Sequence, residues 1–99
     1  MIRRGRFAEV VQRQLDLVEE ENAGLIAECR AALRDYDEAD RDEAPEHYER
    51  FGDLQEELME ALEGIRDGFA RTLEGVTAER YAAEFDRAAA KRFRGLWVG

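Results

Sequence analysis

Small and apolar residues recur along the first part of the chain, from Ala8 to Ala39, at spacings that alternate between three and four. Such a stripe is typical of a long amphipathic helix that packs against another helix. The pattern predicts a helix over about residues 6–39, in which Asn22 is the one polar member of the stripe. The stripe residues expected in the core or at a subunit interface are Val11, Leu15, Val18, Asn22, Leu25, Cys29 and Tyr36.

A second stripe with the same alternation runs from Tyr48 to Val76 and predicts a helix over about residues 45–74. Pro45 suits the first turn of this helix, and Asp42 or a neighbour is expected to cap it. The connection between the two helices is short, so they should lie antiparallel as neighbours. The members of this stripe expected in the core or at the interface are Phe51, Gln55, Leu58, Leu62, Ile65 and Phe69.

A shorter third helix is expected over about residues 78–93, with Gly75 ending the second helix and Thr77 capping the third. Its apolar face contains Tyr81, Phe85 and two alanines. The scarcity of proline and the absence of serine argue against a fold built from turns and strands. The sequence therefore predicts a single all-α domain over residues 1–99, a long antiparallel helical hairpin plus a third helix and a short C-terminal tail.

The predicted helices are long for a chain of this size. A helix of roughly 33 residues is about 50 Å long, whereas a compact domain of about 100 residues has a radius of gyration near 13 Å. One hairpin and a short helix leave apolar positions beside the stripes uncovered. We therefore expect a symmetric homodimer, a coiled-coil-like helical bundle.

Charge is distributed unevenly along the chain, which carries 24 acidic and 15 basic residues and a formal charge of −9. Residues 35–63 hold thirteen acids and only two arginines, Arg41 and Arg50. This balance disfavours nucleic acid as a partner. No apolar run is long enough to span a membrane, and the start of the chain does not resemble a secretory signal. With a single cysteine, we expect a cytoplasmic protein.

Few residues are candidates for catalysis or metal binding. His47 lies near several glutamates, but no Glu-x-x-His pair occurs and the inward stripes carry no carboxylates, so a solvated histidine is preferred to a metal ligand. Cys29 lies within the first stripe, where packing in the core is preferred to nucleophilic chemistry. We expect no catalytic residue, metal or cofactor.

Two polar stripe residues and two glycines suggest structural roles. Asn22 could fix the register of the helices by pairing with Gln55 or with its symmetry mate, or it could lie at a hydrated margin. Gly64 and Gly68 form a Gly-x-x-x-Gly pair, which suggests that the alanine-rich third helix approaches closely.

The tail after the third helix combines cationic and aromatic side chains. Its possible partner-binding residues are Arg92, Phe93, Arg94, Leu96 and Trp97. Packing of Leu96 and Trp97 on a neighbouring helix, or docking on a protein, is favoured over nucleic-acid binding because the rest of the chain is acidic.

These features favour a noncatalytic protein-interaction module that self-associates through its stripes and binds a protein partner. An enzyme or a small-molecule or metal-binding bundle, with a site at Tyr36, His47 and Tyr48 near the hairpin turn, is the alternative. A third possibility is an acidic mimic of nucleic acid, because the acidic belt could occupy a basic protein groove.

Overall fold

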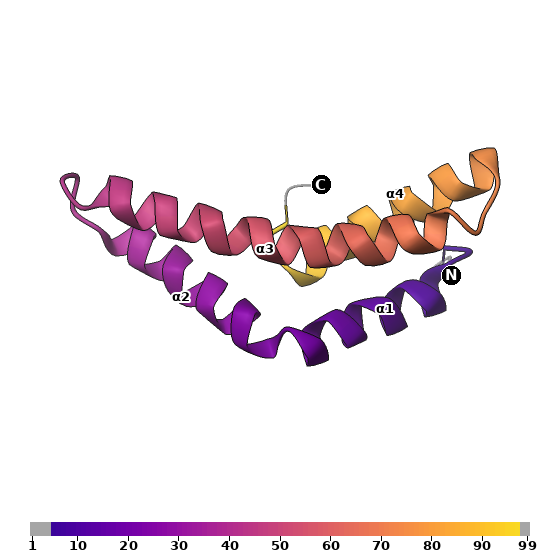
Figure 1. Ribbon diagram of the computed structural model, residues 1–99, viewed down its shortest axis with the longest axis horizontal. Coiled ribbons are helices and arrows are strands. Elements are labelled where there is room, and N and C mark those ends of the chain that lie inside the picture. Colours follow the sequence, from indigo (N-terminus) through magenta and orange to yellow (C-terminus); the bar gives the residue numbers. More distant parts are fainter. Residues whose placement is uncertain (1–4, 98–99) are drawn as a thin grey trace, which may run out of the picture.

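The computed structural model describes residues 5–97, which form an all-α fold of four helices and no strands (Figure 1). The helices are α1 (Ala8–Glu21), α2 (Ala23–Glu38), α3 (Ala44–Ala70) and α4 (Gly75–Arg92). The predicted hairpin is present, because α2 packs along α3. The helix α4 packs against both α3 and α1.

The first predicted helix is interrupted, so the expectation of one continuous helix over residues 6–39 is wrong. Asn22 lies between α1 and α2, with φ −123° and ψ 27°. Its side-chain Nδ2 donates to the Val18 carbonyl oxygen at 3.0 Å, and its backbone N–H donates to the same oxygen at 2.9 Å. An asparagine side chain that bonds to nearby backbone competes with helix continuation. The two halves therefore meet at an angle, as Figure 1 shows.

The hairpin turn follows the sequence prediction more closely. α2 ends at Glu38 and α3 begins at Ala44, with Pro45 in its first turn as expected. The residue before the helix is Glu43, and no side chain caps it, so the expected cap by Asp42 or a neighbour is not formed. Backbone hydrogen bonds from Glu43 and Ala44 to the Asp40 carbonyl oxygen close the turn.

The connection from α3 to α4 differs from the prediction by a few residues. α3 ends at Ala70, and hydrogen bonds from the Thr72 N–H and Oγ1 to the Phe69 carbonyl oxygen hold the chain in a turn. α4 begins at Gly75, whose φ is +42°. Thr77 consequently lies within α4 and does not cap it, which corrects the expected start of the third helix.

The core is formed by one face of each helix and by the residues after α4. The buried hydrophobic residues are Val11, Leu15, Val18, Cys29, Ala32, Phe51, Leu58, Leu62, Tyr81, Phe85, Ala89, Phe93, Leu96 and Trp97. Leu25 and Ile65, which the stripes place in the core, are only half-buried and pack at its edge. Asn22, Tyr36, Gln55 and Phe69 are likewise half-buried.

The glycine pair in α3 does not mark a close helix contact. A Cβ atom added at Gly64 or Gly68 would find nothing within 4 Å outside its own helix. The expected close approach of the alanine-rich helix is therefore wrong. That helix packs on α3 and α1, and its buried large side chains are Tyr81 and Phe85.

The molecule is elongated, with a radius of gyration of 15.4 Å and extents of 48 × 31 × 23 Å. None of the described helices combines the length and the apolar character needed to cross a membrane. The long axis contains the hairpin of α2 and α3, one end of which extends beyond the other helices (Figure 1).

Candidate functional site

The outer end of the hairpin is the least covered part of the fold. We call residues 34–53 the arm. α2 contacts α1 and α3 but not α4, and the tail reaches it near Leu33, because a Cβ at Gly95 would lie 3.2 Å from the Leu33 Cδ2 atom. Beyond that point the two helices of the arm extend past the rest of the fold (Figure 1).

The surface of the arm is strongly acidic. It carries nine acids and three arginines, and all of these side chains are exposed. Within the arm, all of which the structure describes, no ion pair forms within 4 Å; the ion pairs found among the described residues belong to Arg66 and Arg92. The negative charge of the arm is therefore directed at solvent.

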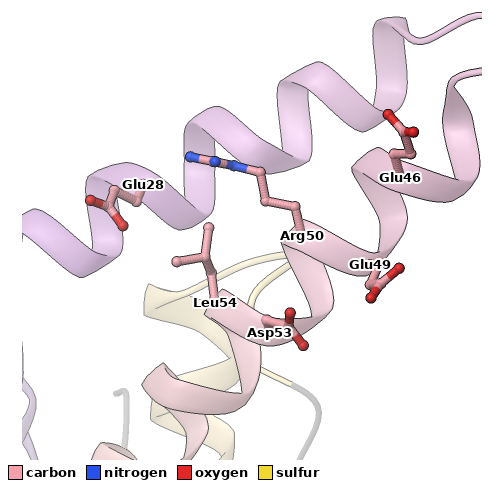
Figure 2. Close-up of a pocket in the computed structure, with 6 residues that line it drawn as sticks. All are labelled: Glu28, Glu46, Glu49, Arg50, Asp53 and Leu54. Atoms are coloured by element: carbon pink, nitrogen blue, oxygen red, sulfur yellow. The ribbon is translucent and has the colours of Figure 1, made fainter.

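An open groove of about 400 Å³ lies along one side of the hairpin. We call it the acidic groove; it is lined by Glu28, Glu46, Glu49, Arg50, Asp53 and Leu54. Arg50 and Leu54 extend from α3 toward α2, whereas Glu49 and Asp53 point away from α2 (Figure 2). Four carboxylates therefore line the groove together with one guanidinium, and none of them forms an ion pair with it within 4 Å.

A second groove, of about 300 Å³, lies at the hairpin turn. We call it the tip groove; its lining residues are Tyr36, Arg41, Ala44, Pro45 and Tyr48. The Tyr36 and Tyr48 rings are tilted by 55°, with centroids 5.4 Å apart. Tyr48 is 61% exposed, which makes it one of the few large hydrophobic side chains on the surface. The tip groove is thus an apolar, aromatic surface within an acidic arm.

The alternative site near the turn is only partly assembled. Tyr36 and Tyr48 meet, as that hypothesis required, but His47 lines neither groove. Among residues 5–97, no group of three or more His, Cys, Asp and Glu side chains is placed to hold a metal ion. The arrangement can attract cationic groups, and its aromatic surface can contact apolar or cationic side chains.

Cys29 is fully buried in the core, as its place in the stripe predicts. Burial raises the pKa of its thiol, and the nearby Glu28 and Glu57 carboxylates raise it further. A protonated, buried thiol is a poor nucleophile. Cys29 is therefore a packing residue.

The tail folds back on the chain. Phe93, Leu96 and Trp97 are buried, and the Gln55 side-chain Nε2 donates to the Leu96 carbonyl oxygen at 3.0 Å. Gln55 thus anchors the tail and does not pair with Asn22. The packing of Leu96 and Trp97 on neighbouring helices occurs within one chain.

The two arginines predicted to bind a partner, Arg92 at the end of α4 and Arg94 in the tail, differ in their surroundings. Arg92 donates to Asp16 at 2.6 Å and to Gln12, and it lies 3.5 Å from a Glu19 carboxylate oxygen. Arg94 is exposed. Of the residues expected to bind a partner through the tail, Arg94 is therefore the one left on the surface.

The sequence pattern predicts only part of the tip groove. Tyr36 and Tyr48 belong to the site predicted near the hairpin turn, and their pairing follows from their places on either side of a short turn. Arg41, Ala44 and Pro45 belong to the connection, and the spacing of apolar residues gives no signal that they line a groove.

Comparison with known proteins gives no match: no family model, curated protein or solved structure is significantly similar to this chain. The fold defines a small all-α protein with an acidic two-helix arm.

Proposed function

We propose that this protein is a noncatalytic cytoplasmic interaction module that binds a protein partner through its arm. The observation that carries this proposal is the uncovered end of the hairpin, where an exposed aromatic side chain lies within an acidic surface. Exposed apolar surface with a polar rim is typical of protein-binding sites. Aromatic side chains are also enriched among the residues that dominate binding energy.

Self-association is the second part of the proposal. The chain exposes 7069 Å², whereas a compact monomer of this mass exposes about 5,800 Å². The difference exceeds the roughly 800 Å² that each partner buries in a standard interface. The fully buried stripe residues are already covered within the chain. A dimer would therefore use the half-buried apolar side chains at the margin of the core, together with Leu17, an exposed apolar residue of α1.

Light scattering tests this second part. A homodimer has twice the monomer mass of 11.4 kDa. A stable particle of monomer mass at micromolar concentration would remove self-association and leave the binding of a protein partner by the arm to be judged separately.

A paired set of charge variants tests the first part. Asp40→Asn/Glu43→Gln removes two carboxylates from the arm, and Glu20→Gln/Glu21→Gln removes two exposed carboxylates from α1. Tagged proteins are recovered from the native host and their bound proteins compared. We expect a partner that the α1 variant retains and the arm variant loses. Equal retention by both variants would argue against the arm.

The ligand-binding alternative has one observation in its favour, the tip groove with its two tyrosines. Native mass spectrometry separates it from the interaction module. A copurified small molecule or metal that is lost on Tyr48→Ala, which removes a ring from the tip groove, would favour the alternative.

A further inference from the structure

The tip groove lies at the end of the arm, in a part of the chain that is rich in acidic residues. We propose that it receives an arginine or lysine side chain from a basic segment of the partner protein. This inference rests on the interaction function proposed above and specifies the chemistry of the partner. Two features support it: the residues that line the groove, and the charged residues next to them in the sequence.

The lining of the tip groove suits the side chain of a cationic residue. Tyr36, Ala44, Pro45 and Tyr48 provide apolar contact for the methylene groups of arginine or lysine. Tyr48 is 61% exposed, so a ring is accessible to a cation. A guanidinium or ammonium group within about 6 Å of a tyrosine ring is attracted by the negative face of the ring.

The residues next to the groove in the chain supply the complementary charge. Residues 37–46 contain six acids and one base, and all seven of these side chains are exposed. Asp37 is adjacent to Tyr36, and Asp40 and Asp42 flank Arg41 in the turn. A basic segment crossing the tip would therefore approach a turn rich in exposed carboxylates, and these would steer its approach.

A second copy of this chain fits the tip groove poorly. Each chain carries a formal charge of −9, and the acidic belt of residues 35–63 has thirteen acids against two arginines. Two arms brought together would place like charges opposite one another, which costs free energy. A basic segment of a different protein supplies the opposite charge without bringing two acidic arms together.

Arg41 gives the proposal a prediction with a definite sign. It is the one cationic side chain lining the tip groove. If the groove receives a cation, Arg41 repels it, and Arg41→Ala should strengthen binding. If the partner were acidic or purely apolar, the same substitution would weaken binding or leave it unchanged.

The experiment uses a short fluorescein-labelled peptide of alternating arginine and alanine, with matched peptides that carry glutamine or glutamate in place of arginine. Binding to the full chain is measured by fluorescence anisotropy. We expect only the arginine peptide to bind, with a dissociation constant that rises as salt is added. Tyr48→Leu keeps an apolar side chain but removes the ring, and should weaken binding about fivefold.

Charge variants separate local recognition from general attraction. Asp40→Asn/Glu43→Gln should weaken binding about threefold, whereas Glu20→Gln/Glu21→Gln, with the same change in charge on α1, should leave it unchanged. Circular dichroism confirms that each variant is folded. Equal weakening by both charge variants, or no effect of Tyr48→Leu, would overturn the proposal, as would failure of the arginine peptide to bind.

Other outcomes distinguish this inference from the proposed function. Equal binding of the arginine and glutamine peptides, both weakened by Tyr48→Leu, would show that the arm is a docking surface for a partner that is not basic. The basic segment would then be wrong and the interaction module would stand. Growth in particle mass without added peptide, abolished by Tyr48→Leu, would show that a second copy occupies the tip and would overturn the inference.

Discussion

The Glu84 carboxylate of α4 accepts a hydrogen bond of 3.0 Å from the backbone N–H of Phe7, directly before α1. The two residues are 77 positions apart in the sequence. An amide at the start of a helix has no partner within that helix, and a negative charge there is favourable. This contact ties the first helix to the last one. It also brings the carboxylate against Gly5, where an added Cβ would overlap it.

We predict that Glu84→Ala lowers the free energy of unfolding by about 1–2 kcal/mol, because it removes a charged acceptor from a half-buried amide. Gly5→Ala should have a similar effect, since its Cβ displaces the carboxylate. The test is a double-mutant cycle measured by urea unfolding. In the Glu84→Ala background, Gly5→Ala should cost almost nothing, whereas additive costs would show that the two residues act independently.

Four stripe residues that the sequence pattern treats alike, Leu25, Leu58, Leu62 and Ile65, differ in how deeply they are buried. Leu58 and Leu62 are fully buried, and we predict that truncating either to alanine costs about 2–5 kcal/mol. Leu25→Ala and Ile65→Ala should cost less, because those side chains are half-buried. Glu20→Ala is the exposed control and should change stability by no more than about 0.5 kcal/mol. Equal costs at all four apolar positions in urea unfolding would contradict this packing.

Asn22 provides a prediction that runs against helix propensity. Alanine is a better helix former than asparagine, yet Asn22→Ala should destabilise the protein by about 1 kcal/mol, because it removes the bond to the Val18 carbonyl and favours a straight helix. A straight helix would separate α1 from α4 or α2 from α3. Glu21→Ala, one residue earlier and exposed, is the matched control. Stabilisation by Asn22→Ala in thermal unfolding would mean that the break is incidental.

Two buried groups, Cys29 and Tyr81, are expected to lower stability at alkaline pH. Burial raises the pKa of Cys29 above its ordinary value of 9.0 and that of Tyr81 above 10.0. The folded state then keeps these protons at pH values where the unfolded chain has lost them. The contribution of the two groups to the free energy of unfolding is therefore fully present below about pH 9 and is lost as the pH rises. The urea midpoint should decline above pH 9, and Cys29→Ala should flatten the first part of that decline. An unchanged slope in Cys29→Ala would assign the decline to other groups.

The hairpin and most of its core could be predicted because they depend on local periodicity. Leu15, Leu58 and Leu62 are buried where the stripes place them, and the short turn sets α2 beside α3. The break at Asn22 could not be predicted, because a polar stripe residue is compatible with pairing between helices or with a hydrated margin, and neither requires the helix to end. In the structure the Asn22 side chain instead donates to the Val18 carbonyl oxygen of the preceding helix.

The position of the tail and the surface of the arm depend on contacts between distant parts of the chain. Gln55 binds the Leu96 carbonyl, and Tyr81 donates to the Gln14 side chain at 2.6 Å, and neither pair has a signature in local spacing. Because the break turns α1 toward α4, the tail fills the space beside α2 and α3. The arm extends beyond the tail and is left uncovered. The charge of residues 35–63 predicts an acidic surface but does not predict that this part of the hairpin is uncovered.

The central claim is that the tip of the arm contacts a basic segment of a protein partner. Photo-crosslinking in the native host tests it most directly, with Tyr48→p-benzoylphenylalanine at the tip and Val76→p-benzoylphenylalanine as the control. The control matches the tip in exposure, since Tyr48 is 61% and Val76 62% exposed. The account predicts an adduct at position 48, absent at position 76, whose crosslinked peptide is rich in arginine or lysine. No protein adduct at position 48, or the same adducts at both positions, would contradict it.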